Sequence, residues 1–368
     1  MTRKTLGVGI VGLNIGVSWA SLSHLPALRQ LSDQFTVIGV ANRSAESAQT
    51  AAADAGIPRS FESVDALLQC PDVDIVTVTV RVPAHRKIVE AALRAGKHVY
   101  CEWPLAVDLD EAKVLTELAR EKGLCAVIGT QAAVRPEIEY VRSLVEDGQI
   151  GNVQSVSVLG SGLRWGNEVD PRSAYLIDEK NGATMLSIPM GHTLAAIQRV
   201  LGPVSSVSGA TGTACERVRV TGTGEELLQT AADQVSLIGY LQSGAQLSVH
   251  YRGGTPPGKG LYWEIHGSEG DIVIEAANGH SQMMPLTISM ARHGENALVE
   301  VTPPAELFEG LPDTPIARNV ALMYARMAKV IGGGQAYLPN FDDALKLHQL
   351  IDAIAQSAKD RKWIDLGA

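Results

Sequence analysis

Residues 98–105 read His-Val-Tyr-Cys-Glu-Trp-Pro-Leu, a short apolar strand that runs directly into a Glu-x-Pro turn. Pro104 fixes its own φ and disfavours helical geometry at the preceding residue, so Glu102 and Trp103 are expected to project stiffly from the strand end. Open parallel sheets bind ligands at the carboxyl ends of their strands. A lysine at position 103 could exchange a proton there, whereas an indole offers one N–H and no titratable group. The stretch therefore indicates a ligand site whose catalytic role is open.

Apolar runs of strand length alternate with helical patterns on either side of this stretch. The expected strands are 6–12, 36–41, 73–80, 98–101 and 125–129, and the expected helices are 19–31, 45–55, 63–68, 84–95 and 110–122. The run 73–80 is β-branched almost throughout, as in a strand that is buried on both faces. This alternation predicts βαβ units, and hence a doubly wound parallel sheet in an α/β dinucleotide-binding domain of residues 1–130.

From residue 131 the pattern becomes β-rich. The expected strands are 153–159, 205–210, 234–240, 246–251, 261–266 and 271–275, and the expected helices are 189–201, 318–332 and 342–358. Several of these strands alternate polar and apolar residues, as in an antiparallel sheet with one solvated face. We predict an α+β substrate and oligomerisation domain over 131–368, with a large open sheet and with last helices that are candidates to pack on the first domain. The segment 253–258, Gly-Gly-Thr-Pro-Pro-Gly, is interpreted either as a mobile loop near the site or, preferably, as a hairpin connection.

Composition narrows the class of protein. The 368 residues carry a net charge of −9, with 45% hydrophobic and 19% charged residues. The acidic balance argues against direct binding to nucleic acid or to acidic membranes, and no apolar run reaches the ~18 residues of a membrane span. Four scattered cysteines without metal-ligand spacing predict reduced thiols, no metal site and a cytoplasmic location.

The turn after the first strand is the candidate phosphate loop. Residues 12–17 read Gly-Leu-Asn-Ile-Gly-Val, and only Gly12 stands cleanly in a G-x-G-x-x-G fingerprint. Asn14 occupies the place of the second glycine, and asparagine tolerates left-handed geometry. We take Gly12, Asn14 and Ile15 as cofactor contacts.

The residues at the end of the expected second strand indicate whether NAD or NADP is preferred. A carboxylate there would bind the adenosine ribose hydroxyls of NAD, but the sequence places Asn42, Arg43 and Ser44 at this point. A neutral amide, a guanidinium and a hydroxyl suit a 2′-phosphate, which favours NADP over NAD. The alternative is a solvated helix start in which Ser44 is the N-cap.

Several segments together resemble the Gfo/Idh/MocA oxidoreductase family. They are 73–78 (Val-Asp-Ile-Val-Thr-Val), 82–85 (Val-Pro-Ala-His), 91–99 (Ala-Ala-Leu-Arg-Ala-Gly-Lys-His-Val), 102–105 (Glu-Trp-Pro-Leu), 191–192 (Gly-His), 266–271 (His-Gly-Ser-Glu-Gly-Asp) and 338–344 (Leu-Pro-Asn-Phe-Asp-Asp-Ala). The resemblance spans nearly the whole chain and implies a nucleotide-binding oxidoreductase fold. It also implies cofactor contacts from Arg81, Pro83, His85, Glu102, Trp103 and Gln131.

Two departures from that family affect catalysis. Sugar-oxidising members typically use a Glu-Lys-Pro lysine with an aspartate and a histidine on a later helix; this chain has Trp103 for the lysine and Ala195 three residues after His192. His192 is then the main acid–base candidate, with Tyr175 or Asp178 as possible helpers. In residues 12–14 (Gly-Leu-Asn), 19–20 (Trp-Ala), 102–103 (Glu-Trp), 191–193 (Gly-His-Thr) and 252–254 (Arg-Gly-Gly), the chain also resembles the galactose-regulon repressor branch of the family. That branch is understood to sense rather than to catalyse.

The remaining candidates concern substrate. Arg164 and Trp165 offer a guanidinium for hydroxyls and an aromatic face for a sugar ring, although a surface loop explains them equally well, and Arg135 is a candidate contact near the domain boundary. The main interpretation is an NADP(H)-dependent oxidoreductase that acts on a carbohydrate or polyol. The alternative is a non-catalytic sensor of a dinucleotide or sugar. The resemblance also implies a homodimer or homotetramer formed through the second-domain sheet.

Overall fold

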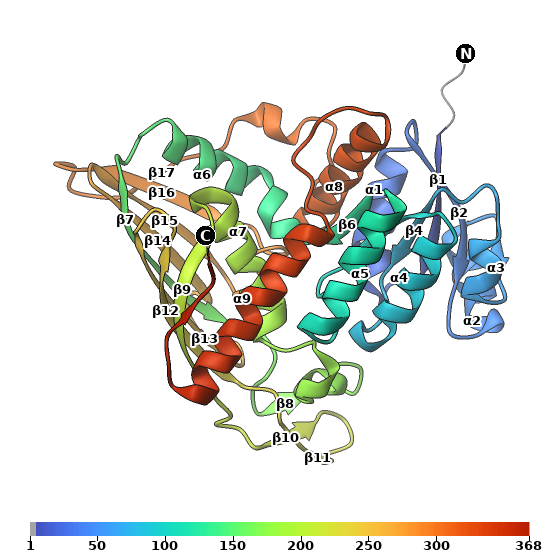
Figure 1. The fold of residues 1–368 in the computed structure, drawn as a ribbon, viewed down its shortest axis with the longest axis horizontal. Coiled ribbons are helices and arrows are strands. Elements are labelled where there is room, and N and C mark those ends of the chain that lie inside the picture. The colour runs from blue at the N-terminus through green and yellow to red at the C-terminus, as the bar shows by residue number, and fades with distance from the viewer. Residues whose placement is uncertain (1–4, 368) are drawn as a thin grey trace. The chain divides into compact units, whose positions relative to one another are not determined.

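The computed structural model describes residues 5–367, which form two compact units. The first unit contains the chain up to residue 131 together with 310–346, and the second contains 132–309 together with the chain from 347 onward. Figure 1 shows the sheet of each unit with its helices. No helix among the described residues is both long and apolar enough to cross a membrane.

The first unit is built on a parallel sheet of six strands. They are β1 (Leu6–Val11), β2 (Phe35–Ala41), β3 (Ser60–Phe61), β4 (Ile75–Val78), β5 (His98–Glu102) and β6 (Ala126–Gly129). Their order is β3-β2-β1-β4-β5-β6, and every pairing is parallel. The order reverses between β1 and β4, and ligands bind beside the carboxyl ends of strands at such a switch point.

Two helices of the first unit begin at residues whose side chains cap them and end at glycines. The helices of this unit are α1 (Leu25–Gln30), α2 (Ala45–Ala55), α3 (Val64–Leu68), α4 (His85–Arg94), α5 (Leu109–Lys122), α8 (Pro315–Ile331) and the start of α9 (Phe341–Asp360). The side chains of Ser44 and Asp108 cap the amino ends of α2 and α5, and Gly56 and Gly123 end these helices in left-handed geometry. A π-helix, η1 (Ala20–His24), precedes α1, and α8 packs on both.

The second unit contains the large sheet. Its strands are β7 (Val153–Ser161), β9 (Val204–Gly212), β12 (Gln234–Leu241), β13 (Gln246–Arg252), β14 (Leu261–Gly267), β15 (Gly270–Ala276), β16 (Thr287–Arg292), β17 (Val299–Glu300) and β18 (Ile364–Asp365). They run in the order β17-β16-β15-β14-β7-β13-β12-β9-β18, and of these pairings only β7 with β13 is parallel. Helices α6 (Pro136–Glu146), α7 (Gly191–Leu201) and the end of α9 lie on one face (Figure 1). The predicted fold class is therefore confirmed.

A small accessory sheet of the second unit was not predicted. It joins β8 (Glu168–Val169), β10 (Arg217–Val220) and β11 (Glu226–Leu228), and it is accompanied by two 3₁₀ turns, η4 (Ala174–Ile177) and η5 (Glu179–Asn181). Its core is a separate cluster of Val169, Ile177, Val218 and Val220. Strands this short carry almost no periodic signal, which is why the sequence pattern did not reveal them.

The glycine-rich segment 253–258 is not a hairpin connection, so that interpretation was wrong. Strands β13 and β14 lie on opposite sides of β7, and the segment crosses from one to the other. It also holds the 162–166 loop, because the amide of Gly254 donates to Arg164 O at 2.8 Å and that of Leu163 donates to Gly254 O at 3.1 Å. Gly253 permits this approach, since a Cβ there would lie 1.9 Å from Trp165 O.

We therefore expect Gly253→Ala to destabilise the protein by about 1–3 kcal/mol, because the new methyl group must displace the backbone of the 162–166 loop. The measurement is the urea unfolding midpoint of wild type and variant. The matched control is Gly258→Ala in the same segment, where an added Cβ meets no atom within 4 Å. Equal destabilisation by both substitutions would contradict this account of the segment.

Candidate functional site

The loop after β1 adopts the geometry of a phosphate-binding turn. Gly12 has a φ of 104° and Gly16 a φ of 73°, so both need glycine. A Cβ on Gly12 would lie 3.0 Å from Thr79 Oγ1, at the end of the neighbouring β4. Asn14, which we expected to supply the left-handed residue, is not among the positive-φ residues, and Gly16 takes that role two positions later.

One backbone amide of this loop is left for a ligand. The amide of Asn14 donates to Ser18 Oγ at 2.9 Å, and that of Gly16 donates to Ser21 Oγ at 2.9 Å. Within the described residues the amide of Ile15 donates to no protein group. A free N–H at the turn between a strand and the following helix suits a phosphate oxygen.

Beside this loop lies a cavity of about 310 Å³ at the carboxyl ends of β1 and β2. Its lining is Leu13, Asn14, Ile15, Asn42, Ser44, Glu46, Ser47, Thr50, Ala51 and Asp54. The Asn42 amide binds the chain itself: it accepts from Leu13 N at 3.0 Å and donates to Leu13 O at 2.8 Å and to Ser47 O at 3.0 Å. Ser44 is the N-cap of α2, as the alternative interpretation held, and Arg43 is exposed next to it.

At the end of β5, a buried polar network holds the carboxylate of Glu102. His24 Nε2 lies 2.8 Å from Glu102 Oε1, and Gln131 Nε2 donates to both carboxylate oxygens at 2.8 and 2.9 Å. The Glu102 side chain is only 13% exposed. Among residues 5–367, no lysine or arginine forms an ion pair with it. Gln131 Oε1 is buried without a partner, so it remains an acceptor for a ligand.

The network continues into the interior through residues that sequence reasoning missed. His24 Nδ1 lies 2.9 Å from the Tyr324 hydroxyl, which lies 2.8 Å from Thr77 Oγ1. Burial raises the pKa of Tyr324 well above its ordinary value, so the phenol stays neutral. A lone histidine in an apolar helix and a tyrosine 300 positions away in the sequence gave no local signal for this pairing.

The other predicted cofactor contacts of the first unit are placed differently. His85 is buried, and its two ring nitrogens lie 2.9 Å from Pro104 O and 2.9 Å from Val80 O. Burial lowers the pKa of His85 although both neighbours are acceptors. The ring therefore fixes the Glu-Trp-Pro turn and is not free for a cofactor, which corrects our prediction for this residue. Arg81 and Pro83 are exposed at η2 (Val82–Ala84), whereas Trp103 is 5% exposed and does not project into solvent.

In the second unit, His192 lies at the start of α7, directly after the π-helix η6 (Leu186–Met190). The residue is 3% exposed, and its Nδ1 is buried without a partner. Burial, together with the nearby His280, lowers the pKa of His192 to about 3. The imidazole is therefore neutral at physiological pH and a weak base.

Neutral hydroxyls surround the next residue of this helix. Thr193 Oγ1 lies 2.7 Å from the Tyr251 hydroxyl and 3.1 Å from Ser281 Oγ, and Tyr251 donates to Gly279 O at 3.0 Å. Burial raises the pKa of Tyr251, so this phenol also keeps its proton. Ala195 is partly exposed one turn after His192 and supplies no acid or base.

The predicted aromatic platform is buried and backbone-strained. Trp165 is 2% exposed, donates its indole N–H to Leu176 O at 2.9 Å and stacks on His280 with ring centroids 6.5 Å apart. A surface loop therefore does not describe Trp165. Both Leu163 (φ 62°) and Trp165 (φ 58°) are left-handed without being glycine, a strain that is common at functional sites. Contact of the ring with a sugar stays a prediction.

The remaining predicted side chains of the second unit are engaged by their neighbours. Arg164 lies 3.2 Å from Asp170 Oδ2 and donates to Ser173 Oγ at 2.7 Å. Asp178 accepts from Lys180 N at 3.1 Å as the N-cap of η5, and Tyr175 is half-buried in η4. The roles proposed for Tyr175 and Asp178 stay predictions.

Arg135 was wrongly assigned as a substrate contact. Its side chain is 0% exposed and binds Glu137 through two nitrogens, at 2.9 and 2.8 Å. The third guanidinium nitrogen donates to Met284 O at 2.9 Å and to Ser281 O. A fully buried guanidinium that uses four of its five N–H donors on protein groups fixes the chain and is not exposed to a sugar.

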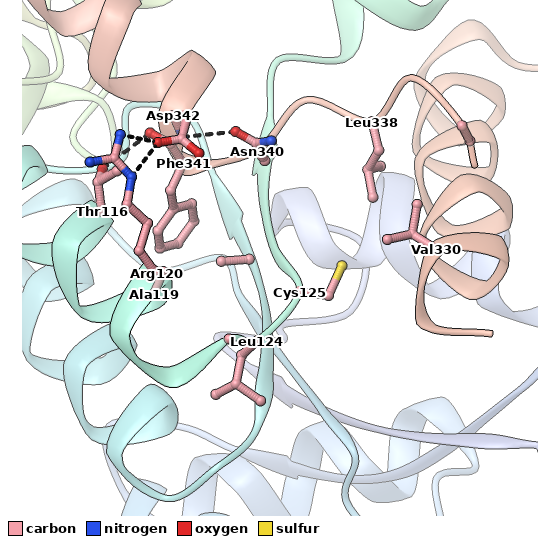
Figure 2. Close-up of a pocket in the computed structure, with 13 residues that line it drawn as sticks. Thr116, Ala119, Arg120, Leu124, Cys125, Val330, Leu338, Asn340, Phe341 and Asp342 are labelled. Atoms are coloured by element: carbon pink, nitrogen blue, oxygen red, sulfur yellow. Dashed lines mark hydrogen bonds and ion pairs between the residues drawn. The ribbon is translucent and has the colours of Figure 1, made fainter. Parts of the chain in front are cut away.

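Figure 2 shows a second cavity of the first unit, of about 320 Å³, where β6 begins. The Cys125 thiol, Leu124 and Val330 line it, and Arg120 at its edge forms an ion pair with Asp342. This is the amino end of the strand, whereas the phosphate loop lies at carboxyl ends. The cavity is therefore separate from the candidate cofactor site.

The residues of the first unit fit a dinucleotide. The free Ile15 amide can donate to a pyrophosphate oxygen, the two left-handed glycines let the backbone approach it, and Gln131 Oε1 can accept from a hydroxyl or amide of the ligand. When bound, nicotinamide supplies hydride chemistry, and the protein supplies position and electrostatics.

Comparisons with known proteins match different families to the two parts of the chain. Residues 6–130 match the Gfo/Idh/MocA oxidoreductase family with its NAD-binding Rossmann fold, and residues 136–276 match the C-terminal domain of Gal80p. The chain is similar to the galactose/lactose metabolism regulatory protein GAL80 of Kluyveromyces lactis, at 25% identity over 99% of this chain and 96% of that protein. It is likewise similar to the dehydrogenase aclE of Aspergillus oryzae, at 26% identity over 97% of both chains.

A solved structure extends the likeness to the fold. The super-repressor mutant of Gal80p from Saccharomyces cerevisiae superimposes with a TM-score of 0.90 and 22% identity, over 99% of this chain and 98% of that one. Together, the sheet order, the glycine turn and the family matches identify residues 6–130 as a Rossmann domain of the Gfo/Idh/MocA oxidoreductase family and residues 136–276 as a C-terminal domain of the Gal80p type.

Proposed function

We propose that this protein is a dinucleotide-binding regulatory protein that senses a nucleotide, a sugar or both, without catalysing hydride transfer. The observation that carries the proposal is the state of His192. Burial lowers its pKa to about 3, while positions 103 and 195 hold tryptophan and alanine. A general base works best with a pKa near the operating pH, so none of these three positions provides an efficient proton path.

The relatives support the same choice. The relative from Kluyveromyces lactis is named as a regulatory protein and matches nearly the whole chain. The structural match to a Gal80p repressor covers both units and supports the fold. A regulator needs a dinucleotide site but no acid–base pair, and the glycine turn together with tryptophan at position 103 and alanine at position 195 supports this combination.

A second candidate is an NADP(H)-dependent oxidoreductase that acts on a carbohydrate or polyol. The observation that favours it is the equally extensive match to a protein named as a dehydrogenase. In that case His192 would move the proton, with Tyr175 or Asp178 as its helper. Asp178 is engaged in the η5 turn, which weakens this assignment.

The open face of the second-unit sheet is the proposed surface for self-association, as a dimer or tetramer. Large apolar side chains are exposed along its central strands, namely Leu159 on β7 and Ile238 and Tyr240 on β12. Clustered exposed apolar groups of this kind mark protein contacts. We place the protein in the cytoplasm, where its four free cysteines would stay reduced.

The test of the proposed function combines binding with turnover. We expect the pure protein to bind NADP⁺ or NAD⁺ but to reduce neither with aldoses, polyols or glycosides, and Trp103→Lys to give no turnover. Binding is followed by calorimetry and reduction by absorbance at 340 nm. Substrate-dependent reduction that is lost in His192→Asn would establish the oxidoreductase instead.

We also propose a preference for NADP over NAD, because position 42 lacks a carboxylate and Arg43 is exposed beside the adenosine-side cavity. Arg43→Glu should weaken NADP(H) binding at least ~10-fold more than NAD(H) binding, since it replaces an attraction for the 2′-phosphate with a repulsion. The measurement is the ratio of the two dissociation constants. An unchanged ratio would remove Arg43 from the specificity site.

The neutral histidines predict a pH dependence of stability. Burial lowers the pKa of His192 to about 3 and that of His280 to about 4, below the ~6.5 of an unfolded histidine. The unfolded state therefore binds more protons, so stability should fall as the pH drops from ~6.5 to 4, by up to about 1.4 kcal/mol per pH unit for each histidine.

The measurement is the free energy of unfolding against pH. Below pH 6.5, His192→Gln should reduce the slope of the unfolding free energy against pH by the contribution of one histidine. Between pH 7.5 and 9, the difference in unfolding free energy between variant and wild type should stay constant. A variant with the wild-type slope below pH 6.5 would show that His192 is not buried as a neutral group.

A further inference from the structure

The charge at the end of β5 is unbalanced. Glu102 receives its hydrogen bonds from His24 and Gln131, and no arginine or lysine of the described chain pairs with it. The next residue, Trp103, is uncharged and buried. Within the described residues, no side-chain cation of arginine or lysine therefore offsets the carboxylate of Glu102.

The hydrogen-bond chain behind Glu102 orients the His24 ring toward the carboxylate. If Thr77 donates to Tyr324, Tyr324 can donate to His24 Nδ1, and His24 Nε2–H then points at the carboxylate. In the opposite direction Tyr324 would donate to Thr77, whose own O–H would then lack an acceptor in the part of the chain that the structure describes. Leaving a buried hydroxyl donor unsatisfied is costly. In the first direction, the Nε2–H of His24 is therefore aimed at Glu102, so two donors hold the carboxylate.

The strand order places this charge on the nicotinamide side of the candidate cofactor site. The adenosine-side cavity lies at the ends of β1 and β2, and the phosphate loop follows β1. A dinucleotide extended across the switch point reaches the ends of β4 and β5 with its other half. The nicotinamide ring carries a positive charge when oxidised and none when reduced.

Resting on the proposed dinucleotide binding, we propose that Glu102, held by His24 and Gln131, makes the protein selective for the oxidised dinucleotide over the reduced one. The carboxylate attracts the cationic ring, and the indole of Trp103 adds an aromatic group that does not repel it. Redox state, rather than the amount of dinucleotide alone, is then the signal that the first unit reads.

The test compares affinities for NADP⁺ and NADPH. We expect the wild type to bind NADP⁺ more tightly, and Glu102→Gln to lower this preference at least about tenfold, which is the effect of a unit charge about 12 Å away at an effective dielectric of ~20. The matched control is Glu117→Gln, which removes one carboxylate from the exposed face of α5 and should leave the ratio unchanged. Thermal unfolding of each variant checks that it is folded.

Trp103→Lys is a second, independent variant, because an added cation should lower the same ratio without removing the carboxylate; it decides the outcome if Glu102→Gln does not fold. Equal affinities in the wild type, or an unchanged ratio in a folded Glu102→Gln, would overturn the inference and leave dinucleotide binding intact. Absence of binding to either form would instead overturn the proposed function, and the selectivity with it.

Discussion

The partly buried carboxylate of Glu102 is the constraint around which the first unit is arranged. A carboxylate that leaves water must receive hydrogen bonds from the protein, and two donors do this here: His24 on η1 and Gln131 after β6. His24 in turn requires the hydroxyl of Tyr324 on α8. One side chain thereby ties together segments that lie up to about three hundred positions apart in the sequence. The requirement also accounts for the C-terminal α8 within a domain that otherwise ends near residue 131.

In the described part of the second unit, two buried histidines have no carboxylate partner, in contrast to His24 of the first unit. His192 and His280 lie in the interior without a carboxylate partner, so burial keeps both neutral. Thr193 and Tyr251 satisfy each other as neutral hydroxyls, and the buried guanidinium of Arg135 is matched by Glu137. The first unit thus holds a carboxylate without an arginine or lysine partner at the end of β5, whereas the second unit holds neutral histidines, paired hydroxyls and an arginine matched by a carboxylate. Proton transfer needs a group that changes charge near neutral pH, and this second arrangement suppresses such changes.

Local pattern predicted the elements and the fold class but not the polar networks. Runs such as 45–55 and 98–102 carry a full helical or strand signal within a dozen residues, so α2 and β5 lie where expected. The His24–Glu102 contact joins positions 78 apart, and no periodicity encodes which distant donor meets a carboxylate. The same limit explains Arg135: its sequence context does not show that Glu137 and two distant carbonyls occupy its guanidinium. Residue type indicates what a side chain can do, whereas its partners decide what it does.

The hydrogen-bond partners of Glu102 and the uncharged Trp103 bear on whether the protein only binds a dinucleotide or also turns over a substrate. A dehydrogenase must stabilise both redox states of its cofactor similarly enough to release the product, and it needs a proton acceptor near the reacting carbon. Neither demand applies to a protein that reports on its ligand. Such a protein gains by binding one state more strongly, because a ligand shifts an equilibrium only by its differential affinity for the states involved. An unpaired carboxylate next to an uncharged tryptophan is a liability for reversible hydride transfer and an advantage for discrimination. The substitution of a titratable side chain by Trp103 therefore changes the electrostatics of the whole strand end, in addition to deleting a catalytic group.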